Sequence, residues 1–201
     1  MLVAQGIPNL RLYFMVGLPT ETPEDVEAIV KLCRQIKHRF LKASRPRKHL
    51  GTITVSLNSF VPKPFTPFQW VAMDPPAELK SKIKTIKSGL RSVANVRVHA
   101  SVPKWDYVQG LLSRGDRQVG TILAQAHHHA GNWPRTFKES PLNPDYYVLR
   151  ERSREELFPW DFIEQGVSKS FLWRELRRAR LGKTSPPCRV KDCHLCGVCR
   201  Q

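Results

Sequence analysis

A continuous apolar run and then a helical repeat of apolar positions predict a strand followed by a helix at the start of the chain. Apolar and aromatic residues fill positions 12–16, which indicates a buried strand that ends at Gly17. From residue 23 to about residue 40, apolar residues recur every three or four positions, as in a helix with one buried face. Thr22 stands where the N-cap of this helix is expected. In βαβ folds ligands sit at the carboxyl ends of strands, so we expect chemistry over residues 17–21.

The next periodic segments predict two more strands and a second helix. Residues 51–60 alternate between β-branched or apolar residues and small polar residues. The polar face suits either the inner wall of an open barrel that holds a ligand or an ordinary solvated sheet face. Residues 75–92 predict an amphipathic helix with Asp74 as its cap, and residues 96–100 predict a third strand. Connections of helix length between strands imply a parallel sheet.

Other segments follow different patterns. Three prolines and three aromatic residues in residues 61–70 predict a stiff loop that covers a ligand mouth or another domain. Beyond residue 100 the pattern becomes that of short helices. We expect helices over residues 105–112, 116–130, 146–157 and 168–180, with a Pro- and Asn-rich connection over residues 131–145.

The composition adds a basic character and narrows the cellular setting. Lys and Arg number 33 against 17 Asp and Glu, which gives a formal net charge of +16. This excess suggests nucleic acid, such as RNA, or another polyanion as a partner, but charge alone does not decide, because solvated helix faces, with acidic regions missing if the chain is a fragment, also explain it. No apolar run reaches the roughly 20 residues that span a bilayer, so we expect no membrane contact. Crowded cysteines fit a reducing compartment, which points to the cytoplasm.

The most specific chemical signal is a cluster of four cysteines near the end of the chain. The spacing is Cys188-x4-Cys193-x2-Cys196-x2-Cys199. Four thiols within twelve residues can converge on a single metal centre, and thiolates suit zinc or an iron–sulfur cluster. Closely consecutive x2 spacings favour the iron–sulfur cluster and leave zinc as the alternative.

Several stretches together resemble one enzyme superfamily. Gly17-Leu-Pro-Thr-Glu-Thr22 stands where radical S-adenosylmethionine (SAM) proteins usually have Gly-Leu-Pro-Gly-Glu-Thr after the fifth strand of their barrel, with Thr20 replacing the second glycine. Residues 56–70 resemble the sixth-strand segment and its proline loop. The region after the barrel resembles large bacterial proteins that join a cobalamin-binding-like domain to a radical SAM barrel. The stretches that carry this likeness are residues 109–117, 158–161 and 167–174 and the Cys-x-x-Cys-Gly-Val-Cys ending.

The resemblance implies an α/β fold: the C-terminal portion of a partial (β/α) barrel with parallel strands, followed by a helical extension and a cysteine-rich tail. The implied bounds are residues 1–100 for the barrel portion, 101–183 for the extension and 184–201 for the metal-binding tail. In the intact protein, a catalytic 4Fe–4S cluster would cleave SAM to a 5′-deoxyadenosyl radical that abstracts a substrate hydrogen. The residues implied to contribute to the cofactor pocket are Met15, Val16, Gly17, Glu21, Phe60, Val61 and Pro62.

The sequence also departs from the superfamily. It lacks the Cys-x3-Cys-x2-Cys that binds the catalytic cluster and the early glycine-rich segment that holds SAM. We therefore expect the chain to be the C-terminal part of such a protein, inactive by itself and without a catalytic residue of its own. Its expected partner is the missing N-terminal part of the barrel, in the same chain or a separate one. The alternative is a basic RNA-binding or tRNA-modification accessory module with structural zinc, because tRNA methylthiotransferases share the Gly-Leu-Pro-type turn.

Overall fold

The computed structural model describes residues 2–188, 193 and 195–199, and these form two compact units. The first unit consists of Met1–Phe60 and Asp74–Asp106, and the second of Val61–Met73 and Tyr107–Gln201. The proline-rich loop after the second strand thus belongs to the second unit, whereas the segments that flank it in sequence belong to the first. Part of the predicted cysteine-rich tail, residues 189–192, 194, 200 and 201, lies outside the described residues.

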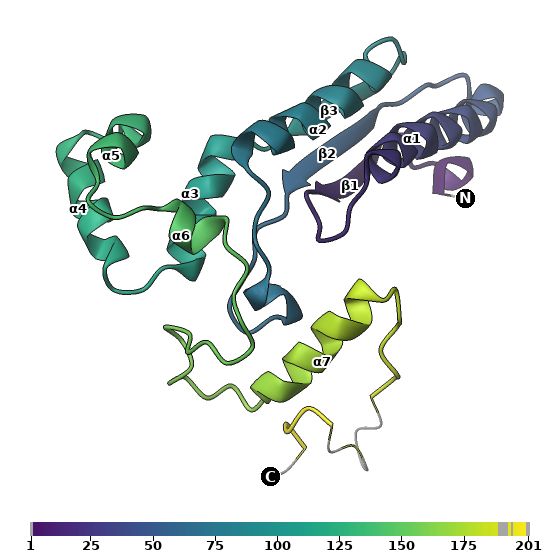
Figure 1. Cartoon of the computed structure of the whole chain (residues 1–201). Coiled ribbons are helices and arrows are strands. Elements are labelled where there is room, and N and C mark those ends of the chain that lie inside the picture. Colours follow the sequence, from purple (N-terminus) through teal and green to yellow (C-terminus); the bar gives the residue numbers. More distant parts are fainter. Residues whose placement is uncertain (1, 189–192, 194, 200–201) are drawn as a thin grey trace. The chain divides into compact units, whose positions relative to one another are not determined.

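The first unit is built on a parallel sheet with the strand order β1-β2-β3 (Figure 1). This confirms the predicted mixed α/β class with parallel strands. The two long helices each connect one strand to the next, as the periodicity predicts. The elements are η1 (Leu2–Gln5), β1 (Leu10–Val16), α1 (Pro23–Ser44), η2 (Arg45–Arg47), β2 (Ile53–Ser59), α2 (Pro76–Leu90) and β3 (Val96–Ala100).

Helices cover one face of this sheet. Ile53, Val55 and Leu57 of β2 are buried, and their neighbours in register lie on the same face of β1 and β3. Helix α2 packs on both outer strands and against α1. The Arg34 guanidinium on α1 donates to the Gly89 carbonyl on α2 over 2.8 Å. The strand alternation therefore places an apolar layer between sheet and helices and leaves the polar positions on the other face.

The N-cap prediction for the first helix is confirmed. Thr22 accepts a hydrogen bond from the Asp25 N–H at 3.3 Å, and the Asp25 carboxylate accepts one from the Thr22 N–H at 2.9 Å. This reciprocal pair is a capping box. The helix continues to Ser44, beyond the predicted end near Phe40, and the buried Ser44 hydroxyl donates to the Phe40 carbonyl over 2.9 Å.

The cap predicted for the second helix is wrong. Helix α2 begins at Pro76 with Pro75 in the N-cap position and no side-chain cap bond. Asp74 instead binds the Lys82 ammonium over 2.7 Å. An ion pair with a lysine inside the same helix thus takes the carboxylate that the sequence pattern assigns to the helix end.

The second unit is helical. Two predictions there are wrong: α6 is a single turn rather than a helix over residues 146–157, and α5 lies inside the expected connection. The Arg152 N–H donates to the Trp70 carbonyl over 2.8 Å, which holds the backbone after α6 outside a helix. The N-cap Asn132, which accepts from the Arg135 N–H at 3.2 Å, starts α5. The elements are η3 (Pro67–Trp70), α3 (Pro103–Arg114, which begins in the first unit), α4 (Val119–His128), α5 (Trp133–Glu139), α6 (Asp145–Val148) and α7 (Lys169–Arg180).

The proline-rich loop supplies the aromatic core of the second unit. Trp70 is fully buried, and its ring lies 5.6 Å from Phe158 and 5.1 Å from Trp173 of α7 between centroids. The Trp160 indole N–H donates to the Gln69 side-chain oxygen over 2.9 Å. Residues 61–73 therefore pack with segments almost a hundred positions further along the chain.

Candidate functional site

The turn between β1 and α1 is closed by a carboxylate. The Gly17 N–H donates to Glu21 Oε1 over 2.9 Å, and the same oxygen lies 2.8 Å from Lys82 Nζ. Lys82 also binds Asp74, so one ammonium joins two carboxylates from different segments. The Glu21 side chain is only 6% exposed. Burial lowers the pKa of Lys82, but the hydrogen bonds and charges of Asp74 and Glu21 outweigh burial, and its pKa is raised.

The backbone of this turn needs glycine at its first position. Gly17 has φ +82, and an added Cβ would lie 2.6 Å from Leu79 Cδ2. Thr20 also adopts a positive φ of 69, a conformation that non-glycine residues rarely take. This is the position where the resembled family usually has its second glycine. The tight turn is therefore kept, although this sequence carries threonine there.

The carboxyl ends of the other strands carry a second polar group. The Phe60 N–H donates to the Val16 carbonyl over 2.8 Å and so ties the end of β2 to that of β1. Beyond β3, the Ser101 hydroxyl donates to the Asp106 carboxylate over 2.6 Å and accepts from the Ser59 N–H at 3.1 Å. The edge where ligands of parallel sheets bind thus carries a fixed serine–aspartate pair.

The sheet face opposite the helices carries polar and aromatic side chains. Tyr13 is 67% exposed and Met15 46% exposed, and both lie on this open face together with Arg11. In register, one row across the strands is Arg11, Thr54 and Arg97, the next is Tyr13, Ser56 and His99, and the third begins with Met15 and Asn58. Guanidinium, imidazole and phenol groups on one surface can bind an anionic or planar ligand.

The structure distributes the predicted pocket residues over three kinds of position. Met15 lies on the open sheet face, and Gly17 and Glu21 form the turn. Val16 and Phe60 are buried at the ends of β1 and β2, which the backbone hydrogen bond between these two residues joins. Val61 and Pro62 belong to the second unit, where the Pro62 carbonyl accepts from the Ser113 hydroxyl at 3.0 Å.

Sequence reasoning missed several residues of this region. Lys82 binds Glu21 and is itself bound by Asp74. No local sequence pattern pairs either residue with a turn so far away in the chain. Arg97 and His99 could have been found, because their alternation along β3 places them on the same face as the polar positions of β2. The missed signal was thus the register between strands rather than any single residue.

The cysteine-rich tail is anchored to the start of α7. The Ser168 N–H donates to the Cys196 carbonyl over 2.7 Å, and the Arg174 guanidinium donates to the Leu195 carbonyl over 2.9 Å. Gly197 has φ +101, and an added Cβ would lie 2.9 Å from the Gly166 carbonyl oxygen. Cys188, Cys193 and Cys196 line a cavity of about 370 Å³ beside this helix.

The other three cysteines act electrostatically on Cys188. The pKa of Cys188 is raised, first by desolvation, next by the charge and hydrogen bond of Cys193, and then by Cys199 and Cys196. Within the described residues, the structure brings no three Cys, His, Asp or Glu side chains into a metal-binding arrangement. The donor set nevertheless fits a thiophilic metal, because thiolates that repel one another are stabilised by a shared cation.

Comparisons with known proteins add one relative. The chain is similar to an uncharacterised protein of Methanocaldococcus jannaschii, with 33% identity over 118 residues. The alignment covers 59% of this chain and 24% of that protein, so the chain spans about a quarter of the length of the relative that it matches. No protein-family model and no solved structure matches the chain. Among the described helices, none has the length and apolar character needed to cross a membrane.

Proposed function

We propose that the chain is the C-terminal part of a radical SAM iron–sulfur enzyme. In this proposal, β1 and β2 are the fifth and sixth strands of a partial (β/α) barrel, and the second unit is a helical extension. The four cysteines hold an auxiliary cluster or a structural zinc. The cytoplasm supplies the reducing conditions that such thiolates need.

The observation that carries this proposal is the parallel sheet with one covered face and one open polar face. A barrel of parallel strands has helices on the outer face of its sheet and binds ligands at the carboxyl ends of its strands. The strand end at Val16, the glycine turn and the buried Glu21 form a preorganised rim at the carboxyl edge. Similarity to part of a longer protein agrees with a chain that works together with further barrel strands.

In this proposal, the chain's own residues bind and orient. The Met15–Gly17 strand end contributes to the adenine side of a SAM site, and Glu21 keeps the turn in place through the Gly17 N–H. The open face, with Tyr13 and His99, lines the interior. SAM and a catalytic cluster, when bound in the intact protein, supply radical chemistry. Cys188, Cys193, Cys196 and Cys199 would hold the separate metal centre.

Metal analysis of anaerobically purified protein tests the proposal. A brown protein with about four irons is expected, because four thiolates suit a 4Fe–4S cluster. Cys196→Ser should lower the iron content, whereas Cys33→Ser should leave it unchanged because Cys33 is fully buried on α1. Colourless protein that holds one zinc, or iron that Cys196→Ser leaves in place, would argue against the cluster.

A second function is favoured by the same open face. Exposed Tyr13 lies beside Arg11, and Arg97 and His99 follow across the sheet. RNA-binding sheets stack unpaired bases on aromatic residues and hold phosphates with basic ones. The chain would then be an accessory module of RNA modification, with structural zinc in the tail.

Titration with tRNA at two salt concentrations distinguishes this second function. Specific binding should survive the higher salt concentration and weaken on Tyr13→Ala. The matched control is Phe162→Ala, because Phe162 is 85% exposed but lies in the second unit. Affinity that equals that for any polyanion, or that both variants lower alike, would reject the RNA-binding function.

A further inference from the structure

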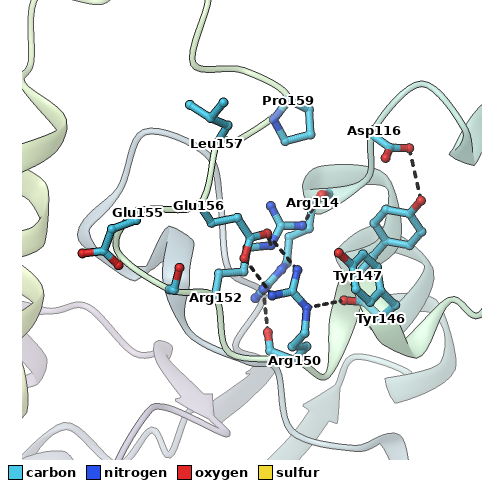
Figure 2. A pocket seen from close by; sticks show the side chains of 11 residues that line it. Arg114, Asp116, Tyr146, Tyr147, Arg150, Arg152, Glu155, Glu156, Leu157 and Pro159 are labelled. Carbon is cyan, nitrogen blue, oxygen red and sulfur yellow. Dashed lines mark hydrogen bonds and ion pairs between the residues drawn. The ribbon is translucent and has the colours of Figure 1, made fainter.

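A cavity of about 480 Å³ in the second unit is lined by three arginines (Figure 2). It is formed by the end of α3, the connection to α4, the turn α6 and the extended segment after it. Its volume falls within the range of about 300–1,000 Å³ that is usual for small-ligand sites. The residues used below are Arg114, Tyr146, Arg150, Arg152, Glu156 and Leu157.

Two of these arginines are buried, and their hydrogen bonds go to backbone carbonyl oxygens, which carry no net charge. Arg114 is fully buried and Arg152 is 4% exposed. Arg114 donates to the carbonyls of Val71 and, over 2.8 Å, Arg150. Arg152 donates to the Arg114 carbonyl over 2.5 Å. Carbonyl oxygens satisfy hydrogen bonds without cancelling the charge, and buried charge is costly unless it is paired.

Each buried guanidinium also keeps an unused donor. Within the described part of the chain, the Nε atoms of Arg114 and Arg152 are buried without a hydrogen-bond partner. Guanidinium donors that find no acceptor inside a protein carry a full desolvation cost. Within the described residues, the protein's own acceptors therefore leave both guanidinium groups partly unsatisfied.

A single carboxylate is shared among the three arginines. Arg150 binds Glu156 through two hydrogen bonds of 2.7 and 2.8 Å, and Arg152 Nε lies 3.7 Å from the same carboxylate. Two further acidic residues line the cavity: Asp116 accepts from a tyrosine hydroxyl and its charge acts on Arg152, and Glu155 points away from the arginines (Figure 2). Of the three carboxylates, only that of Glu156 forms ion pairs with these arginines, so three guanidinium groups share one directly paired carboxylate.

The protonation equilibria reflect this arrangement. Burial and, after it, the positive charges of Arg152 and Arg150 together lower the pKa of Arg114 to about 9. The hydrogen bonds from Arg150 lower the pKa of Glu156, which is therefore ionised at neutral pH. The positive charges oppose one another more than this one carboxylate compensates, and a bound anion would relieve them.

We propose that this cavity binds the phosphate group of a small phosphate ester. The forks of Arg150 and Arg152 bind the phosphate oxygens, since guanidinium matches oxyanion geometry with two parallel hydrogen bonds. In the free protein Glu156 takes the place of the phosphate, which displaces it on binding. Tyr146 and Leu157, which are 56% and 86% exposed, contact the organic part of the ester at the rim.

Calorimetric titration of the full chain with phenyl phosphate, at fixed ionic strength, tests the site. Arg150→Gln should weaken binding about tenfold or more, because it removes two charged donors. The matched control Arg135→Gln removes a solvent-exposed arginine that also pairs with a glutamate, Glu139 at 2.8 Å, and should leave binding unchanged. If circular dichroism shows Arg150→Gln to be unfolded, Arg150→Lys replaces it, since lysine keeps the charge and loses the fork.

Removing the Glu156 carboxylate should have the opposite effect on the affinity for phosphate. Glu156→Gln should tighten binding, because it removes the group that competes with phosphate, whereas Glu139→Gln should not. Inorganic phosphate serves as the second ligand, and weaker binding than that of phenyl phosphate is expected if Tyr146 and Leu157 contact the ester. Absence of saturable binding by the unchanged protein, or equal weakening by Arg150→Gln and Arg135→Gln, would overturn the phosphate site. Binding of inorganic phosphate as tight as that of the ester would overturn the ester as ligand.

Discussion

The Glu21 carboxylate reaches back four residues to accept the Gly17 N–H at 2.9 Å, and it does so while paired with Lys82. A single acidic side chain thereby fixes the turn after β1 and joins it to α2. Because the carboxylate is almost fully buried, removing it costs more than removing a surface carboxylate, since its buried donors lose their acceptor.

Glu21→Ala should lower the free energy of unfolding by about 2–3 kcal/mol, because it leaves the Gly17 N–H without its acceptor and Lys82 with one carboxylate instead of two. Glu21→Gln keeps an acceptor and should cost about 1 kcal/mol. Urea denaturation measures both. The control Glu27→Ala removes an exposed pair with Lys31 at 3.8 Å and should change stability by less than about 0.5 kcal/mol. Equal effects at positions 21 and 27 would contradict the structural role of Glu21.

Gly17→Ala should destabilise the protein by about 1–3 kcal/mol, because alanine at φ +82 is strained and its Cβ meets Leu79. Gly120→Ala is the matched control. Gly120 lies in α4 with open space around it, and alanine there should stabilise the helix by up to about 1 kcal/mol. Thermal unfolding followed by circular dichroism should show opposite signs for the two variants, and the same sign would be inconsistent with the strained turn.

These two residues show what the sequence could and could not provide. The strand, the glycine turn and the capped helix depend on residues that are neighbours in the chain, so the sequence predicts them. The ion pair of Glu21 with Lys82 depends on how α2 packs beside β1, which no local pattern encodes. Asp74 stands before a helix and was therefore predicted to cap it, but its carboxylate pairs with Lys82 inside that same helix. The arginine cavity is formed by four separate segments, so no continuous stretch of the sequence predicts it.

Buried Cys33 should make stability fall in alkaline solution. Burial raises the pKa of its thiol to about 11 from an ordinary value of 9.0. Between these pH values the unfolded chain binds fewer protons than the folded protein, so the free energy of unfolding decreases as pH rises. The full effect is about 2–3 kcal/mol. Urea denaturation from pH 8 to pH 11 should show a shallower decline for Cys33→Ala than for the unchanged protein, and parallel declines would refute the assignment.

Gln69→Met should cost about 2–4 kcal/mol. The Gln69 oxygen accepts from the Trp160 indole at 2.9 Å and from the Phe65 N–H at 3.1 Å, and methionine fills similar space without an acceptor. Gln118→Met, at an exposed position without a side-chain cap bond, should be nearly neutral. Tryptophan fluorescence during chemical unfolding reports both. A neutral Gln69→Met would mean that the loop over residues 61–73 does not depend on this bond.

The strand order has a practical consequence for anyone who produces the chain alone. Within the described residues, β1 and β3 each pair with β2 on one side, so the unit has two outer strands with free backbone donors and acceptors. Such edge strands can pair with strands of other molecules, which promotes aggregation at high concentration. Supplying a segment that adds a strand along β1 would satisfy that border, and the yield of dispersed protein would then report whether the right segment has been supplied.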